Sequence, residues 1–305
     1  NTSIELPNNV IDALVARIKI LCDMNLDEKR KPQDGRFSAR TDGRKIDFRV
    51  STFPTYFGEK VVMRILDQDK GVQRLDDIGM LPEHLDMVKK ALKKPYGLIL
   101  ISGPTGSGKT TTLYSMLMEI DRETQNVLSL EDPVEYNMEG ISQSQVHSEI
   151  GYTFASGLRT TLRQDPDVIM VGEIRDKETA QLAIQAALTG HLVLSTLHTN
   201  NAAQTIDRII DSFDPQQQDQ IRVQLAGSLL GIFSQRLIPR IAGGRVPAYE
   251  LLINNSAVAN IIREKRTHEI NTVIETSSDQ GMIDMNRSLL ELVQRGEISI
   301  ESAYQ

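Results

Sequence analysis

Apolar residues near the start of the chain recur every three or four positions. This spacing brings them to one face of a helix, so it predicts an amphipathic helix within residues 4–22. The apolar positions are Leu6, Val10, Leu14, Ile18 and Leu21.

Farther along, the pattern changes to an alternation of polar and apolar residues. Residues 36–40 and 45–51 alternate in this way, and Asp42-Gly43 lies between them as a turn, which is typical of a β-hairpin. Residues 58–66 predict another strand. We therefore expect residues 1–70 to form a small α/β domain with antiparallel strands.

A polar linker that contains Gly71 and Gly79 is predicted over 71–80. Over 81–254, short apolar strands then alternate with helices, which indicates βαβ units and a largely parallel sheet covered by helices. The strands are expected at 98–102, 126–130, 167–171 and 191–196, and the helices at 109–120, 154–163 and 177–188. Residues 255–305 show helical periodicity only, so they predict a C-terminal helical subdomain.

The composition is ordinary for a globular protein, with 40% hydrophobic and 25% charged residues. The formal net charge of −7 argues against a dedicated nucleic-acid binder, which usually carries a basic surplus. No stretch approaches the ~20 apolar residues that cross a bilayer, so we predict no direct membrane insertion. The chain begins with Asn1 rather than methionine, and we expect it to be a fragment of a longer protein.

Cys22 is the one cysteine of the sequence. A single thiol cannot form an intrachain disulfide or supply a cysteine-rich zinc cage. It lies in the apolar run 18–22, and we interpret it as a small buried hydrophobic residue.

A phosphate-binding loop follows the first strand of the alternating region and precedes a helix. Its residues fit G-x-x-x-x-G-K-[ST] completely: Gly103, Pro104, Thr105, Gly106, Ser107, Gly108, Lys109 and Thr110. The glycines let successive backbone N–H groups and the helix N-terminus point at a polyphosphate. Lys109 is expected to reach the β- and γ-phosphates, Thr110 to bind Mg²⁺, and the nucleotide contacts to extend to Thr111.

Two acidic clusters each follow an apolar strand, where ligands of open α/β sheets bind. The first is Glu131-Asp132-Pro133-Val134-Glu135, and the second is Gly172-Glu173, in which Gly172 stands where a Walker B strand commonly ends in Asp. Phosphoryl transfer to water needs a carboxylate near the metal and a group that orients the water. We favour Glu173 near Mg²⁺ and Glu135 near the water, and the division of roles stays open. Glu131 and Asp132 fit a structural role equally well.

The strand after Gly190 also ends in a polar cluster, where Thr196 and His198 are candidates to sense the γ-phosphate. His191 fits a structural role as well as a functional one. Arg49 and Arg64 lie in strand-like runs of the small domain. Their spacing alone favours surface salt bridges, although an arginine can stabilise transition-state charge from a neighbouring subunit.

Together these motifs resemble the secretion ATPases: the type II secretion, type IV pilus assembly and pilus retraction ATPases. The blocks resemble the family's Walker A, aspartate box, Walker B and histidine box, in the family's order. The resemblance rests on residues 30–36, 48–51 and 58–64 in the small domain and on 103–110, 131–135, 162–167, 171–176 and 189–200 in the core.

The resemblance implies a small PAS-like α/β domain, incomplete at its start, joined to a RecA-like P-loop ATPase core. It also implies a homo-hexameric ring that hydrolyses ATP with Mg²⁺ between the two domains. Arg49 and Arg64 match family arginines that reach the nucleotide, and His191 and His198 match its histidine box. The family's partner is an inner-membrane platform protein, which implies a cytoplasmic motor held at the inner membrane through partners.

Two departures from the family pattern bear on cofactors and direction. Many assembly-type members carry a four-cysteine zinc motif after the segment that here reads 234–237, and this chain has none, so we predict no zinc. Residues 257–264 resemble the retraction branch, whereas the small domain resembles the assembly branch. The sequence therefore predicts a motor for pilus assembly or type II secretion, with pilus retraction as the alternative.

Two further classes of function compete with a secretion motor. A RecA-like nucleic-acid translocase fits the core, but the net acidity and the lack of an aromatic-basic stripe argue against it. A nucleotide-binding scaffold with little turnover fits the phosphate loop alone, but Lys109, Glu135 and Glu173 argue for hydrolysis.

Overall fold

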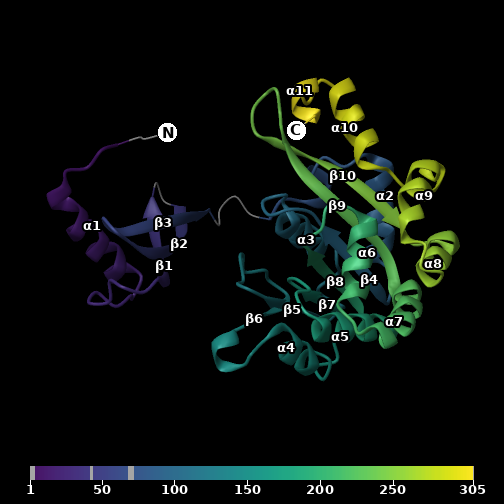
Figure 1. The fold of residues 1–305 in the computed structure, drawn as a ribbon, viewed down its shortest axis with the longest axis horizontal. Helices are drawn as coiled ribbons and strands as arrows, with labels where there is room; N and C mark the ends of the chain where they lie inside the picture. Colours follow the sequence, from purple (N-terminus) through teal and green to yellow (C-terminus); the bar gives the residue numbers. More distant parts are fainter. Residues whose placement is uncertain (1–3, 42–43, 68–71, 305) are drawn as a thin grey trace. The chain divides into compact units, whose positions relative to one another are not determined.

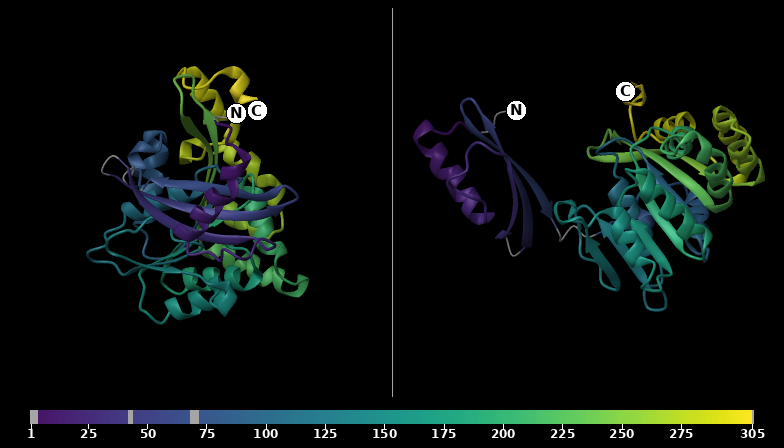
Figure 2. Two further views of the ribbon diagram at one scale, coloured as in Figure 1. Left: turned by 90° about the vertical axis from the view of Figure 1, so that its left-hand side faces the viewer. Right: turned by 60° about the horizontal axis from the view of Figure 1, so that its bottom comes forward.

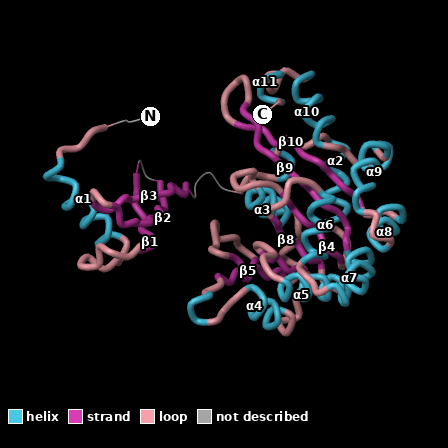
Figure 3. Tube along the Cα trace, in the orientation of Figure 1, coloured by secondary structure: helices cyan, strands magenta, loops and turns pink. Residues whose placement is uncertain are grey.

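The computed structural model describes residues 4–41, 44–67 and 72–304. The chain divides into two compact units, Asn1–Gly71 and Val72–Gln305, which are described separately below. Figure 1 shows their helices and strands along the chain, and Figure 3 distinguishes helix, strand and loop by colour. Both units combine helices with sheet, so the α/β class predicted from the sequence is confirmed.

The first unit is a three-stranded antiparallel sheet with one helix across a face (Figure 2). Its strands, in sheet order, are β1 (Gln33–Thr41), β2 (Arg44–Thr55) and β3 (Gly58–Asp67), and the helix is α1 (Asn8–Leu21). The predicted helix and strands are confirmed, and the turn predicted at 42–43 lies outside the described residues.

The two faces of this small sheet differ in chemistry. Val50 packs with Ile18, Cys22 and Met24 in a small buried cluster, which confirms Cys22 as a buried side chain. Residues that pair directly across strands share a face. Arg36 pairs with Arg49, and Arg49 pairs with Arg64, so three arginines form a row on the face opposite to Val50.

The second unit is built on a seven-stranded sheet. Its order is β10-β9-β4-β8-β7-β5-β6, and all neighbours are parallel except the antiparallel pair β9–β10. The strands are β4 (Gly97–Ser102), β5 (Val127–Glu131), β6 (Ile141–Gln145), β7 (Val168–Val171), β8 (Leu192–Leu197), β9 (Leu229–Pro239) and β10 (Arg245–Ile253). The predicted largely parallel sheet is thus confirmed.

Helices cover both faces of this sheet because the strands are apolar on both sides. In β4, Leu98 and Leu100 belong to one buried cluster, whereas Ile99 and Ile101 belong to the other. One face carries α2 (Pro82–Leu92) and α3 (Lys109–Met118), and the other carries α4 (Phe154–Thr161), α5 (Lys177–Leu188), α6 (Ala202–Asp211) and α7 (Pro215–Ser228) (Figure 1).

Residues at both ends of this unit are built into its core. Leu75, Ile78 and Met80, from the segment interpreted as a linker, are buried against α2 and α3. At the other end, Val258 and Ile270 join the cluster beneath α6 and α7. The C-terminal helices are α8 (Ser256–Arg263), α9 (Ile270–Thr276), α10 (Met285–Gln294) and α11 (Ile300–Ala303).

The sequence pattern does not predict β6, β9 or β10. The polar residues Ser234 and Gln235 interrupt the apolar run of β9, although both are buried in the structure. β9 and β10 are joined by a short turn in which Gly243 and Gly244 both have positive φ angles. In the part of the chain that the structure describes, no helix is long and apolar enough to cross a membrane.

Candidate active site

The phosphate loop lies between the carboxyl end of β4 and the start of α3. Gly103, Gly106 and Gly108 have φ angles of +148°, +80° and +89°, a region that side chains other than glycine rarely adopt. A Cβ at Gly103 would lie 2.3 Å from the Gln235 carbonyl oxygen and 2.5 Å from Ser107 Oγ. The loop therefore needs glycine for both its backbone conformation and its close packing.

Lys109 is the first residue of α3, and its side chain turns back over the loop. Its Nζ donates to the carbonyl oxygens of Gly103 at 2.8 Å and Pro104 at 3.0 Å. Burial lowers the pKa of the Lys109 ammonium, and the nearby charge of Glu173 opposes that shift. The ammonium is thus held at the mouth of the loop, within electrostatic reach of an acid from β7.

Gln235 on β9 supports the loop from the neighbouring strand. Its Nε2 donates to the Ser107 carbonyl oxygen at 2.6 Å, and its Oε1 accepts from the Thr112 hydroxyl at 2.7 Å. One residue earlier, Ser234 accepts a hydrogen bond from Ser102. Gln235 is not among the site residues predicted from the sequence, and it lies in the segment 234–237, after which many assembly-type members carry their zinc motif.

Glu173 follows β7 and lies within reach of three basic side chains. His198 Nε2 is 3.7 Å from Glu173 Oε2, and His198 Nδ1 is 3.5 Å from Lys109 Nζ. Arg175 bonds Glu173 directly and also lies 3.2 Å from Asp132 Oδ2. The structure therefore brings together Lys109, Glu173 and His198, three of the residues predicted to serve the reaction.

Hydrogen bonds between the ends of neighbouring strands hold these side chains in place. The Gly172 N–H donates to the Leu130 carbonyl oxygen at 2.8 Å, and the Thr196 hydroxyl donates to the Gly172 carbonyl oxygen at 2.6 Å. A Cβ at position 172 would lie 3.2 Å from that Leu130 oxygen. Glycine therefore gives the backbone after β7 room for this close approach to Leu130. Thr196 is buried and bound to backbone.

The acidic segment after β5 divides into a buried and an accessible part. Glu131 is 3% exposed, and its carboxylate accepts hydrogen bonds from Ser129, Gln143 and Tyr114. Glu131 is therefore held inside the fold by hydrogen bonds, an arrangement that fits the structural alternative. Glu135 lies four residues later in the half-buried loop, and its backbone N–H donates to the Tyr114 hydroxyl at 3.1 Å.

His191 lies outside this cluster, and Arg49 and Arg64 lie in the other unit. His191 precedes β8, where its Nδ1 is 3.1 Å from the Ala186 carbonyl oxygen, at the edge of the sheet opposite to the phosphate loop. It therefore lies at the opposite end of β8 from His198. Arg49 and Arg64 belong to the first unit, as direct partners across β2 and β3.

A cavity of about 230 Å³ adjoins the phosphate loop on the side of α3. The phosphate loop and α3 line it with Gly108, Thr111 and Thr112. The opposite lining includes Asp77, from the segment before α2, and Arg240 and Arg245, from the β9–β10 hairpin. The cavity therefore lies against the first turn of the helix that follows the phosphate loop.

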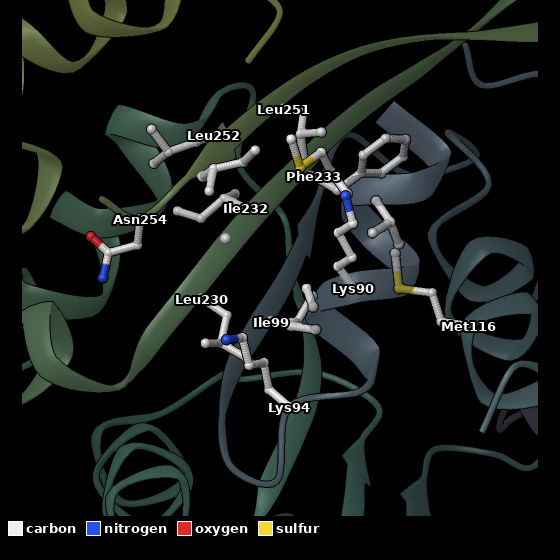
Figure 4. Close-up of a pocket in the computed structure, with 15 residues that line it drawn as sticks. Lys90, Lys94, Ile99, Met116, Leu230, Ile232, Phe233, Leu251, Leu252 and Asn254 are labelled. Atoms are coloured by element: carbon white, nitrogen blue, oxygen red, sulfur yellow. The ribbon is translucent and has the colours of Figure 1, made fainter. Parts of the chain in front are cut away.

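A second cavity of about 200 Å³ lies away from the phosphate loop, between α2 and the strands β9 and β10. Figure 4 shows its lining, in which Lys90 and Lys94 are the charged side chains among mainly apolar ones. Lys109 and the acids that follow β5 and β7 are not among the residues that line this cavity, so it does not belong to the candidate active site.

The phosphate loop fits a bound polyphosphate on its own geometry. Ser107 Oγ is buried and has no hydrogen-bond partner within the described residues, so it is available to a phosphate oxygen. Thr110 is exposed in the first turn of α3. Across residues 4–41, 44–67 and 72–304, no group of three or more His, Cys, Asp or Glu side chains could hold a metal ion by itself.

Curated relatives resemble the chain over most of its length. The Type II secretion system protein HxcR of Pseudomonas aeruginosa is 43% identical over 314 aligned positions, which cover 95% of this chain and 65% of that protein. The Type II secretion system ATPase E of Vibrio cholerae is 48% identical over 238 residues, 78% of this chain and 46% of that protein. The chain thus spans less than two thirds of the length of either relative.

A solved structure resembles the chain as well. The pilus retraction motor PilT with bound ADP has a TM-score of 0.76 and 40% sequence identity, and the match covers 90% of this chain and 77% of that one. Residues 2–243 match the family model described as Type II/IV secretion system protein. Because this family model matches most of the 305 residues, the chain belongs to the Type II/IV secretion system protein family.

Proposed function

We propose that this chain is the ATP-hydrolysing motor subunit of a type II secretion or type IV pilus machine. The observation that carries the proposal is the contact chain beside the phosphate loop. It runs from Lys109 Nζ to His198 Nδ1 at 3.5 Å and from His198 Nε2 to Glu173 Oε2 at 3.7 Å. A loop that only held a nucleotide would not need a histidine and a carboxylate gathered at its lysine.

The phosphate loop would bind the polyphosphate through its backbone N–H groups and Ser107. Lys109 Nζ is held over the loop by two of its carbonyl oxygens, at 2.8 and 3.0 Å. From there it would transfer to the β- and γ-phosphate oxygens of a bound nucleotide. There its ammonium would stabilise the charge of the transferred phosphoryl group. The adjoining cavity would take the nucleoside.

Thr110 and Glu173 fit a Mg²⁺ ion, which P-loop sites hold with one hydroxyl, an acid from the sheet and phosphate oxygens. Mg²⁺ would neutralise charge on the β- and γ-phosphates when it is bound. Glu173 is 17% exposed and already paired with Arg175, so the residues of this chain fix the orientation of its carboxylate.

Glu135 is the candidate to orient the attacking water, since it follows β5 on a loop whose backbone is hydrogen-bonded to Tyr114. His198 lies between Lys109 and Glu173 and would report the presence of the γ-phosphate to the strand β8. Arg49 and Arg64, adjacent on one face of the first unit, would supply positive charge to the nucleotide of the same or a neighbouring subunit.

The motor would act as a homo-hexameric ring in the cytoplasm, bound to an inner-membrane platform protein. Closure of two domains around ATP and their reopening after hydrolysis is a known way to convert binding into movement. Similarity to HxcR and to the ATPase of Vibrio cholerae supports secretion or assembly, whereas similarity to the retraction motor PilT supports the alternative direction. Neither nucleic acid nor direct membrane insertion forms part of this proposal, and zinc is not expected.

The test is the ATPase rate per subunit as a function of protein concentration with Mg²⁺, for the wild type, Glu173→Gln and Arg64→Ala. We expect the specific rate to rise as subunits assemble and to fall at least about a hundredfold in Glu173→Gln. Arg40→Ala, another exposed arginine of the same small sheet, is the matched control for Arg64→Ala.

Each result would separate the candidates. A rate that is independent of concentration and equal in Arg64→Ala and Arg40→Ala would remove the small-domain arginine and the ring from the proposal. Tight ATP binding without phosphate release, in the full-length protein with its partners, would support a nucleotide-binding scaffold instead.

A further inference from the structure

Tyr114 is a buried phenol on the helix that begins at the phosphate loop. It lies on α3, five residues after Lys109, and is 1% exposed. Its hydroxyl donates to Glu131 Oε2 and accepts from the backbone N–H groups of Glu135 at 3.1 Å and Tyr136 at 3.4 Å. A single oxygen thus joins the helix of the phosphate loop to both ends of the acidic loop.

The direction of these hydrogen bonds follows from the chemistry of the groups. The backbone N–H groups of Glu135 and Tyr136 can only donate, so the one proton of the phenol goes to the carboxylate of Glu131. Burial raises the pKa of the Tyr114 hydroxyl, and its hydrogen bond to Glu131 raises it further. The phenol therefore keeps its proton at physiological pH, and the arrangement has one stable polarity.

Glu131 is fixed independently of Tyr114. Its Oε1 accepts from the Ser129 hydroxyl at 2.5 Å and from Gln143 Nε2 at 3.0 Å. Gln143 Nε2 also donates to the Tyr136 carbonyl oxygen at 2.9 Å. The carboxylate is therefore an anchor held from β5 and β6, and the phenol oxygen lies between α3 and residue 135.

We propose that Tyr114 is a positioning residue for hydrolysis, which sets the place of Glu135 relative to Lys109 through the backbone of the acidic loop. This inference rests on the proposed role of Glu135 in orienting water. The ring alone could fill the core, but the hydroxyl contacts only the acidic segment and its anchor. The T-shaped contact of the Tyr114 and Tyr136 rings, with centroids 5.7 Å apart, holds the same loop from the side.

The experiment compares Tyr114→Phe with Tyr152→Phe in the full chain. Both remove one hydroxyl from a tyrosine ring of the same unit, but the Tyr152 hydroxyl bonds Ser144 at 2.7 Å and does not touch the acidic loop. We expect Tyr114→Phe to lower kcat on the order of tenfold, because small misplacements of a catalytic group carry penalties of this size. KM and the Kd for a fluorescent ATP analogue should stay within about twofold, since the phosphate loop is untouched.

A double-mutant cycle with Glu135→Gln separates positioning from general destabilisation. If the hydroxyl acts through Glu135, Tyr114→Phe should lower kcat in the wild type and leave it unchanged in the Glu135→Gln background. Equal effects in both backgrounds, or a kcat for Tyr114→Phe equal to that of Tyr152→Phe, would overturn the proposal.

The proposed function and this inference fail in different ways. A Glu135→Gln variant with wild-type kcat would remove Glu135 from the reaction, and with it the basis of the inference. Loss of activity in Glu135→Gln together with full activity in Tyr114→Phe would overturn the inference alone.

Should Tyr114→Phe not fold, Glu131→Gln serves in its place, because an amide cannot accept from all three donors that surround Glu131. The same loss of kcat at constant KM is expected there, and an unchanged kcat would count against the anchor.

Discussion

The side-chain amide of Gln235 bridges Ser107 and Thr112, with Nε2 at 2.6 Å from the Ser107 carbonyl oxygen and Oε1 at 2.7 Å from the Thr112 hydroxyl. Ser107 belongs to the phosphate loop, and Thr112 lies in the first turn of the helix that follows it. A single side chain from β9 therefore closes the loop onto its helix. Gln235 is 2% exposed, so both of its hydrogen bonds are shielded from water.

Replacing Gln235 with Leu should weaken nucleotide binding and the fold together. The Thr112 hydroxyl and the Ser107 carbonyl would lose their partners in the interior, at about 1–3 kcal/mol for each unsatisfied group. We expect a lower Tm and about a tenfold higher Kd for a fluorescent ATP analogue, because the loop backbone is no longer fixed.

Gln218→Leu is the matched control, since Gln218 Nε2 donates to the Phe213 carbonyl oxygen at 3.2 Å on α7, away from the loop. Its loss should leave the nucleotide Kd unchanged. A Gln235→Leu variant that loses stability but binds ATP analogue with wild-type affinity would show that the loop keeps its shape without this bridge.

Gly103→Ala should abolish nucleotide binding. The residue has a φ of +148°, and its Cβ would lie 2.3 Å from the Gln235 carbonyl oxygen, so the loop must move away from β9. Gly151→Ala is the control, because Gly151 also has a positive φ, +79°, but has open space around the new methyl group. That control should cost about 1 kcal/mol of stability and bind ATP normally. Equal nucleotide affinities in the two variants would contradict the close packing of the loop.

Arg175→Ala should lower kcat without weakening nucleotide binding. Arg175 bonds Glu173 and lies 3.2 Å from Asp132, so it joins the acids that follow two strands. Without it, the Glu173 carboxylate can turn toward Lys109 or His198, and we expect kcat to fall about tenfold at constant KM. Lys177→Ala removes a nearby ion pair, with Asp214, and should leave kcat unchanged. A higher KM with constant kcat would assign Arg175 to nucleotide binding instead.

The sequence predicts the parts of the site that lie next to one another along the chain. The phosphate loop is one continuous motif between a strand and a helix, and the acids lie just beyond apolar strands whose carboxyl ends share an edge. Strand direction also separates the two histidines: His191 precedes β8, and His198 follows it. The packing of β6, β9 and β10 cannot be derived from the sequence, because its pattern does not predict these strands.

Gln235 and Tyr114 show why the remaining part could not be predicted. Gln235 is 128 residues from Ser107 in sequence, and it meets the loop because β9 pairs with β4, a strand neighbour that no local pattern indicates. Tyr114 is among the buried residues of α3, where a tyrosine ring is ordinary core. Its hydroxyl becomes meaningful when the fold brings Glu131 and the backbone of Glu135 to the same oxygen.

Glu250 gives a pH-dependent prediction. It lies on β10, is 6% exposed, and accepts a hydrogen bond from the Ala202 N–H at the start of α6 at 2.7 Å. Burial raises the pKa of the Glu250 carboxyl above its ordinary value of 4.5, and the charge of Asp284 adds to that shift. The folded state therefore holds this proton more tightly than the unfolded state does.

The sign of the effect follows from proton linkage. Below pH 4.5 both states bind the proton, and the contribution of Glu250 to stability is fully present. As the pH rises from there, the unfolded state releases its proton first, and the contribution is lost until the folded carboxyl ionises too. Each unit by which the pKa is raised corresponds to about 1.4 kcal/mol.

Glu250→Gln keeps an oxygen that can accept from Ala202 and does not titrate. We expect its free energy of unfolding, minus that of the wild type, to increase from pH 4 toward pH 7 and then level off, as measured by urea denaturation at each pH. Glu275→Gln, at an exposed glutamate of α9, controls for the loss of a charge. A difference between Glu250→Gln and the wild type that is constant over this range, or that decreases, would mean that the carboxylate is stabilised at the start of α6 and that burial does not dominate its ionisation.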